Sequence, residues 1–167
     1  MAWDDAVQSE YGERSLNFFL SLGQDRAFLD LFNLHYYGAV FETLSAGLHR
    51  LLGEEPPYAY RGLLCGLAAL AAAHWVVCLM RSAGLGRVGW FAGLFLLTNP
   101  QFWGHAFVNS KDIPMAAAYV LWWFCYFKWC EARFQSRKWL VLCGLSLGCV
   151  LAIRVAGLPF IGFTVMA

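Results

Sequence analysis

Long apolar runs separated by short polar connections dominate the chain after residue 62. The runs cover residues 63–80, 88–98, 115–129 and 139–167. The first and the fourth approach or exceed the ~20 apolar residues with which an α-helix crosses a bilayer. The second is short unless it extends through Phe102 and Trp103, and the third follows Pro114, which suits the first turn of a helix. The pattern predicts an all-α integral membrane domain at residues 63–167, with about four transmembrane helices.

The region before these runs, residues 1–62, has apolar and polar positions at helical spacing. Within Val40–Leu52 the apolar positions follow one side, and polar residues that include Glu42 and Ser45 follow the other. That spacing indicates an amphipathic helix that lies in the membrane interface. A second amphipathic helix is expected at residues 5–22. We therefore expect this region to form an extracytoplasmic loop with interfacial helices.

The composition is that of a membrane protein. Hydrophobic residues make up 60% of the 167 residues and charged residues 14%, against roughly 25% charged residues in an ordinary soluble domain. The sequence has no basic cluster and no phosphate-binding glycine motif, so nucleic acid is not an expected partner. The cysteines include no C-x-x-C pair, which favours buried free thiols over a metal site or disulfides. These cysteines are Cys65, Cys78, Cys125, Cys130, Cys143 and Cys149.

Lysine and arginine in the short connections predict the orientation of the chain in a membrane. Connection 81–87 carries two arginines, and connection 128–138 carries four bases against one acid, so both are expected in the cytoplasm. Connection 99–113 carries one base and one acid, and alternation places it outside. Residues 1–61 hold four bases and nine acids, a net charge of 4 − 9 = −5, and they are also expected outside.

The predicted topology places residues 1–62 outside, although no apolar run precedes them that could export them. The sequence also stops within an apolar run, at FTVMA. We therefore expect a fragment that lacks an upstream span and is truncated at both ends.

A short polar island, NPQFWGHAFVNSKDIP at residues 99–114, interrupts the apolar pattern. It holds His105, Lys111 and Asp112, and ionisable residues beside a bilayer are costly enough to mark functional sites. Each has a simpler alternative role. Asp112 could be the N-cap of the following helix, Lys111 could pair with Asp112, and His105 could be an ordinary hydrogen-bonded residue of the interface.

Three further charged residues are candidates for the same outside face. Asp4 and Asp5 open the first expected helix, where carboxylates either stabilise the helix N-terminus or act as a general base. Arg154 lies fifteen residues after Trp139, a distance of about 23 Å along a helix, which puts it near the outer leaflet. A charge at that depth needs a partner or a water-filled cavity, and its level suits a lipid phosphate.

Four segments of the sequence together resemble a known enzyme family. The segments are WDDAVQSEYGERSL, NLHYYGAVFE, PQFWGHAFVNSKDIPMAAAY and GLSLGCVLAIRVAGL. They resemble the phospholipid carrier-dependent glycosyltransferases, which are GT-C superfold enzymes of glycosyltransferase family 39, related to the protein O-mannosyltransferases. The resemblance covers nearly the whole chain and corresponds to the first outside loop and the next four spans. It implies an N-terminal-half fragment of an enzyme of the bacterial inner membrane, with its active site on the periplasmic face.

The resemblance also implies roles for the candidate residues. Asp4 matches the catalytic base of the family's first outside loop, and Asp5 stands where the family commonly has Glu. Asp112 matches a second acid, which opens the span after the next outside loop. The implied ligands of the donor phosphate are His105, Lys111 and Arg154.

The implied reaction is inverting transfer of a sugar from a polyprenyl-phosphate donor. The base deprotonates an acceptor hydroxyl, which attacks the anomeric carbon, and charge-assisted hydrogen bonds stabilise the departing phosphate. The reaction requires no organic cofactor, and a divalent cation that bridges carboxylates and phosphate is compatible with it. The acceptor is not defined by the sequence.

Two other functions are compatible with the apolar pattern. A transporter or channel segment would line its pathway with Arg154 and His74, but this function predicts more polar residues inside the spans than the sequence has. A non-catalytic assembly subunit would keep the fold and tolerate loss of the acids. The enzyme hypothesis requires Asp4 and Asp112 to converge on one cavity, because catalytic groups must reach the same substrate.

Overall fold

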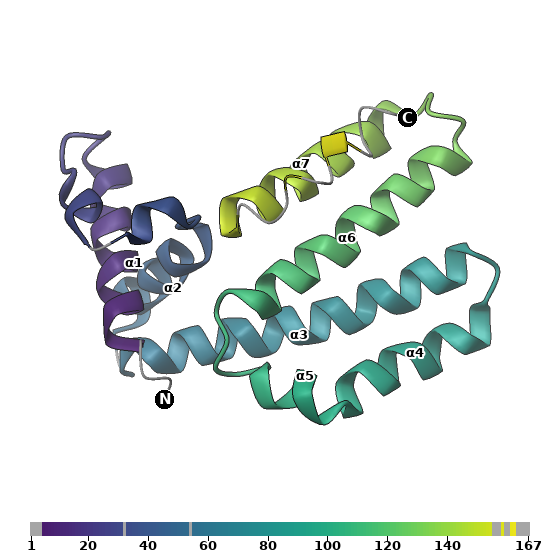
Figure 1. Ribbon diagram of the computed structural model, residues 1–167, viewed down its shortest axis with the longest axis horizontal. Coiled ribbons are helices and arrows are strands. Elements are labelled where there is room, and N and C mark those ends of the chain that lie inside the picture. The colour runs from purple at the N-terminus through teal and green to yellow at the C-terminus, as the bar shows by residue number, and fades with distance from the viewer. Residues whose placement is uncertain (1–4, 32, 54, 155–157, 159–160, 163–167) are drawn as a thin grey trace.

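The chain folds into helices. A computed structural model describes residues 5–31, 33–53, 55–154, 158 and 161–162, and these residues form no β-strand. Seven α-helices and two short 3₁₀ helices follow one another within them (Figure 1). The elements are α1 (Asp5–Leu20), η1 (Ala27–Asp30), η2 (Leu34–Tyr36), α2 (Val40–Leu52), α3 (Pro57–Ser82), α4 (Gly86–Thr98), α5 (Pro100–His105), α6 (Asp112–Glu131) and α7 (Arg137–Ile153).

Four of the helices form a bundle. Helices α3, α4, α6 and α7 run side by side, with α3 between α4 and α6, and α6 between α3 and α7 (Figure 1). Helices α3 and α6 point the same way, and α4 and α7 return. Trp75 of α3 stacks on Phe124 of α6, with ring centroids 5.5 Å apart. The bundle therefore has two ends, one with the starts of α3 and α6 and one with the α3–α4 and α6–α7 turns.

Helices α1 and α2 lie at the first of these ends. They pack against each other, and α2 also contacts α3 and α7 (Figure 1). Gly38, just before α2, passes close to the bundle, because a Cβ at this position would overlap the carbonyl oxygen of Ala152 near the end of α7. A glycine lets two backbones approach this closely. The N-terminal segment is thus held at the end of the bundle where α7 finishes.

Asn99 separates α4 from α5. Its side-chain oxygen accepts hydrogen bonds from the backbone N–H groups of Gln101 and Phe102 at 3.0 and 3.1 Å, which caps the start of α5. Helix α4 therefore ends at Thr98. The second apolar run does not extend through Phe102 and Trp103, because these residues belong to a separate short helix.

One helix meets the length and composition of a transmembrane span. Among the described residues, α3 alone is long and apolar enough to cross a membrane, and its 26 residues extend about 39 Å. Helices α4 and α7 have 13 and 17 residues. Helix α6 has 20 residues, but it is rich in Trp and Tyr, which score low on hydropathy scales. By this criterion the structure supports one span rather than the expected four.

Large apolar side chains nevertheless cover the outside of the bundle. On α4, Trp90, Phe91 and Phe95 are 64%, 72% and 73% exposed. Soluble monomers rarely expose contiguous apolar surface of this kind, whereas a membrane accommodates it. Further exposed apolar side chains on α3 and α7 are Leu63, Leu67, Leu70, Val141 and Leu145.

Helix α2 has the expected bounds. Its orientation differs from that of an interfacial helix, whose polar side would face water. Glu42 and Ser45 are buried against the protein, whereas Leu44 and Leu51 are exposed. Glu42 and Ser45 face the protein, beside the buried Phe41, because Glu42 has charged and polar partners there, as described below. The exposed leucines leave an apolar surface on the outside of α2, beside the end of the bundle.

Candidate functional site beside Asp112

Asp112 is the first residue of α6. The side-chain oxygen of the preceding Asn109 accepts hydrogen bonds from the backbone N–H groups of Lys111 at 3.2 Å and Asp112 at 2.9 Å. Asn109 therefore satisfies the N–H groups that an N-cap would satisfy, and the Asp112 carboxylate is left for other contacts. The side chain of Asp112 is 57% exposed. The N-cap alternative for Asp112 is wrong.

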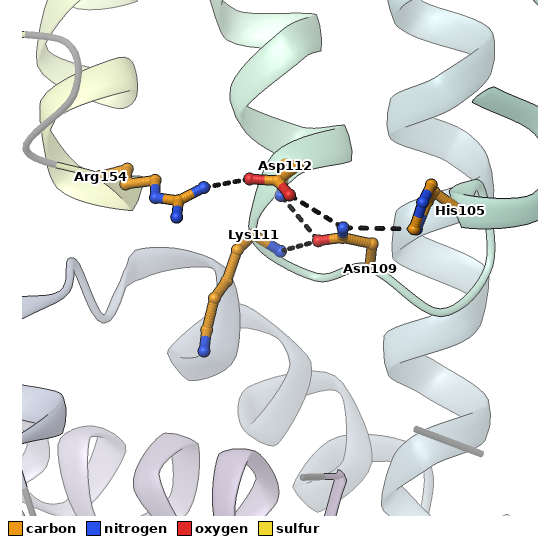
Figure 2. Close-up of polar contacts among 5 residues, drawn as sticks. All are labelled: His105, Asn109, Lys111, Asp112 and Arg154. Atoms are coloured by element: carbon orange, nitrogen blue, oxygen red, sulfur yellow. Dashed lines mark hydrogen bonds and ion pairs between the residues drawn. The ribbon is translucent and has the colours of Figure 1, made fainter. Parts of the chain in front are cut away.

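Arg154 reaches Asp112 from the end of α7. Its Nη1 makes an ion pair with Oδ1 of Asp112 (Figure 2). Helix α7 ends at Ile153, and the backbone of Arg154 is extended. Arg154 therefore stands at the end of a helix, not inside one as a continuous helix over residues 139–167 would require. The sequence indicated that Arg154 needs a partner, and the structure gives it Asp112.

A row of side chains continues from Asp112 to α5. The Nδ2 of Asn109 donates to Oδ2 of Asp112 at 3.0 Å and lies 3.5 Å from Nδ1 of His105, the last residue of α5. Figure 2 shows that His105, Asn109, Asp112 and Arg154 form a row, in that spatial order, across the end of the bundle. The contact with His105 is at the outer limit of a hydrogen bond. Sequence reasoning missed Asn109, although an Asn whose N–H partners lie two and three residues later is a recognisable turn signal.

Lys111 points away from this row. Its side chain is directed to the opposite side of the loop from Asp112 (Figure 2). The Nζ lies 5.1 Å from the ring centroid of Tyr37, in a cation–π contact. Asp112 therefore pairs with Arg154 and not with Lys111, which was one of the alternatives. Lys111 instead connects the loop to the segment before α2.

Two hollows lie on opposite sides of α5. One is an open groove of about 390 Å³ with polar residues along it. The other, of about 180 Å³, is apolar and lies against α3, with Trp103 and Phe107 among its lining residues. Short helix α5 thus separates a polar groove from an apolar hollow. The polar residues of the groove are Asn99, Gln101, His105, Asn109 and Asp112.

Of the acidic pair Asp4 and Asp5, only Asp5 is among the described residues. Asp4 lies outside the described residues, and Asp5 is described as the first backbone position of α1. Gln8, about one turn later on α1, lines a small hollow together with Lys111 and Ser110. The start of α1 therefore lies at the same end of the bundle as the loop that carries Asp112, and the expected convergence of Asp4 and Asp112 stays a prediction.

A buried charged cluster joins α1, α2, α3 and the loop before α6. Oε1 of Glu42 accepts a hydrogen bond from Ser110 Oγ at 2.5 Å, and its Oε2 lies 3.6 Å from Arg61 Nε. Arg61 also donates from Nη2 to Ser9 Oγ at 3.1 Å. The Glu42 and Arg61 side chains are 6% and 5% exposed. Sequence reasoning missed this cluster, because amphipathic spacing assigned Glu42 to a solvated face.

The site offers groups for proton transfer and for anion binding. Asp112 is an exposed carboxylate, and Arg154 has N–H donors beyond the one that Asp112 engages. His105 adds an imidazole at the edge of the groove. Within the described part of the chain, no three His, Cys, Asp or Glu side chains are grouped closely enough to hold a metal ion.

Comparison with known proteins gave no match: no protein-family model, no curated protein and no solved structure is similar to this chain.

Proposed function

We propose that the chain forms the donor site of a membrane glycosyltransferase, which transfers a sugar from a polyprenyl phosphate to an acceptor hydroxyl with inversion at the anomeric carbon. The observation that carries the proposal is the exposed Asp112–Arg154 pair on a groove at one end of an apolar-surfaced bundle. The pair brings a carboxylate and a phosphate-binding guanidinium together at the level where a lipid headgroup would lie. The resemblance of four sequence segments to carrier-dependent glycosyltransferases supports the same chemistry.

In the proposed arrangement, the membrane contains α3, the pair α4 and α5, α6, and α7. The apolar exterior of the bundle supports this arrangement. Helix α6, with 20 residues, extends about 30 Å, which equals the hydrocarbon thickness of a bilayer. The basic turns α3–α4 and α6–α7 lie at the end opposite the groove. The positive-inside rule then puts the groove on the periplasmic face of a bacterial inner membrane.

The proposed reaction uses each candidate residue in one role. Asp4, assisted by Asp5, takes the proton of the acceptor hydroxyl, whose oxygen bonds to the anomeric carbon. The bond between that carbon and the phosphate oxygen breaks, and the departing polyprenyl phosphate carries the resulting negative charge. Arg154 and His105 stabilise that charge by hydrogen bonds, and Asp112 holds Arg154 in place. Lys111 faces the other side of the loop, where it holds the loop against Tyr37. A divalent cation fits the scheme but is not required by it.

Transfer can be measured in membranes that contain the protein, with a radiolabelled polyprenyl-phosphate sugar and a set of candidate acceptors. We expect Asp112→Asn, Arg154→Gln and Asp4→Asn each to lower turnover by about 10²-fold or more, because Asp4 and Arg154 act in the transition state and Asp112 positions Arg154. Glu10→Gln is the matched control, since Glu10 is an exposed acid of α1 that pairs with Arg14. Unchanged turnover in both Asp4→Asn and Asp112→Asn would overturn the assignment of roles.

A non-catalytic assembly subunit is the second candidate function, because the Asp112–Arg154 pair can also fasten α6 to α7. In that case Asp112→Asn lowers stability without any effect on a transfer reaction. The swapped variant Asp112→Arg with Arg154→Asp separates the two functions. A fastening role tolerates the swap, whereas a phosphate site loses the guanidinium from its position and stays inactive.

A further inference from the structure

Six basic residues gather at the end of the bundle opposite the groove. They lie in the α3–α4 and α6–α7 turns and in the helix ends that adjoin them, at the right of Figure 1. Lys128 pairs with Glu131, Nζ to Oε2, at 2.7 Å. The other five are exposed, and none makes an ion pair with another described residue. We call these five the basic end: Arg81, Arg87, Arg133, Arg137 and Lys138.

The fold fixes the positions of these bases. A Cβ added at Gly89 would lie 3.5 Å from Cγ of Arg81, so the stem of Arg81 runs along the start of α4. Arg133 and Phe134 both have left-handed backbone conformations, with φ of 50° and 60°. Their N–H groups donate to carbonyls of the last turn of α6, at 2.9 Å each. The α6–α7 turn is therefore a defined structure that presents Arg133 outward.

Aromatic side chains surround the basic end. Phe134 packs edge-on against Trp129 with centroids 5.1 Å apart, and it is 41% exposed. The Nζ of Lys138 lies 5.2 Å from the ring centroid of Trp139. Aromatic side chains, Trp above all, next to Lys and Arg are typical of the headgroup level of a membrane. The apolar surface of α4 begins directly beside these bases, with Trp90 64% exposed.

We propose that the basic end binds the headgroups of anionic phospholipids in the leaflet next to it. Five bases that have no acidic partner among the described residues, next to an exposed apolar surface, match a headgroup that carries a negative phosphate and is anchored in lipid. Zwitterionic headgroups offer the same phosphate with a neighbouring cation and lack this complementarity. The proposal depends on the bundle being in a membrane, and it does not depend on glycosyl transfer.

The test uses the whole protein in nanodiscs that contain phosphatidylglycerol and phosphatidylcholine in known proportion. After extraction in mild detergent, the retained lipids are measured by mass spectrometry. We expect phosphatidylglycerol to be enriched about fivefold or more over the input proportion, since even one base near an anionic surface gives about that factor. High salt should reduce the enrichment, because it screens exposed charges.

Variants identify the surface that is responsible. Gln at all five positions of the basic end should return the retained lipids to the input proportion, and Lys at the four arginine positions should keep the enrichment. Gln at Arg14, Arg26 and Arg50, at the opposite end, is the matched control and should also keep it. If the variant with Gln at all five positions does not fold, Arg81→Gln and Arg137→Gln are measured singly. Each should lose part of the phosphatidylglycerol enrichment.

Three results would overturn the proposal. The first is a wild-type protein that retains lipids in the input proportion. The second is an enrichment that persists in the Gln variants and in high salt. The third is full displacement of phosphatidylglycerol by inorganic phosphate, which would show that the surface binds the phosphate group without a lipid surface.

Discussion

At the scale of single residues, the Glu42–Arg61 pair is a buried ion pair whose loss should be costly. Both side chains are almost fully buried, and the pair connects the N-terminal helices to the bundle through Ser110 and Ser9. Removing one member of a buried pair leaves the other charge uncompensated, which is far more costly than removing both. The pair is therefore a test of whether α1 and α2 are attached to the bundle as described.

We expect Glu42→Ala to lower the free energy of unfolding by about 3–5 kcal/mol. The double variant Glu42→Leu with Arg61→Met should recover most of that loss, because both charges of the buried pair are removed together. Denaturant unfolding in detergent, followed by tryptophan fluorescence, measures both. Glu10→Gln removes an exposed i,i+4 pair with Arg14 and should cost less than about 1 kcal/mol. An equal loss in the single and the double variant would contradict the buried pair.

Tyr11 gives the N-terminal helices a dependence on alkaline pH. Burial raises the pKa of Tyr11 above its ordinary value, and the Glu42 carboxylate adds to the rise. The hydroxyl donates to the backbone oxygen of Tyr37 at 3.1 Å. Because the folded state disfavours the phenolate, this stabilisation is complete below pH ~10 and is lost as the pH rises through the raised pKa.

The expected result is a loss of stability above pH ~10 that is smaller in Tyr11→Phe than in the wild type. At neutral pH the same variant should be less stable by about 1 kcal/mol, because it lacks the hydrogen bond. Unfolding midpoints measured across this pH range give both values. Tyr58→Phe is the control, since Tyr58 is 45% exposed, and it should keep the wild-type pH profile.

The sequence identified Asp112, His105 and Arg154 because charge is rare in an apolar chain, and the structure brings these three to one place. It did not identify Asn109, whose function depends on the turn that it forms. It also missed the burial of Glu42, because helical periodicity shows that a helix has two faces but not which face meets protein. That choice depends on Ser110 and Arg61, which are distant in the sequence.

At the scale of elements, Gly38 determines how the N-terminal helices meet α7. A Cβ at this position would overlap the carbonyl of Ala152, two residues before Arg154. Gly38→Ala must therefore separate the segment before α2 from the end of α7. The displacement acts on the backbone that positions Arg154 opposite Asp112.

We expect Gly38→Ala to destabilise the protein by about 2–4 kcal/mol, in the range of overpacking substitutions. Gly47→Ala is the matched control, because Gly47 lies within α2 and has nothing within 4 Å of a built Cβ. It should be neutral or stabilising by up to about 1 kcal/mol, because alanine is the better helix former. Thermal unfolding of both variants in one detergent makes the comparison. Similar effects of the two substitutions would contradict the close approach at Gly38.

The positions of several helices were predictable from the apolar pattern, but most of their ends were not. Apolar periodicity gave α2 with its observed ends, and Pro114 lies in the first turn of α6 as expected. The second and fourth apolar runs were divided differently, because Asn99 caps a new helix and the backbone at Arg154 is extended. Both breaks come from local hydrogen bonding and backbone conformation, which hydropathy does not contain.

At the scale of the whole molecule, the groove and the basic end lie at opposite ends of the bundle. In a membrane, the loops at these ends should be accessible from opposite sides. We expect a cysteine at Gln24, beside the N-terminal helices, to react with a membrane-impermeant maleimide from outside. A cysteine at Gln135, in the α6–α7 turn, should react only after the membrane is opened. Both positions are exposed.

The labelling uses a background in which the native cysteines are replaced by serine, since Cys149 is also exposed. Labelling of both positions from one side would contradict a bundle that crosses the membrane. Labelling of Gln135→Cys alone from outside would keep the bundle in the membrane but reverse its orientation. The groove would then face the cytoplasm, which would remove the support for a periplasmic site.

The close approach between Gly38 and Ala152 also constrains the order in which the protein is built. These residues are 152 − 38 = 114 positions apart, and a ribosome needs roughly 6–23 s to add that many residues. For most of that interval α1 and α2 are already made, but the part of α7 against which the segment before α2 packs does not yet exist. We expect α2 to pack on α3 first, and the segment around Gly38 to stay open to proteases during translation until α7 is complete.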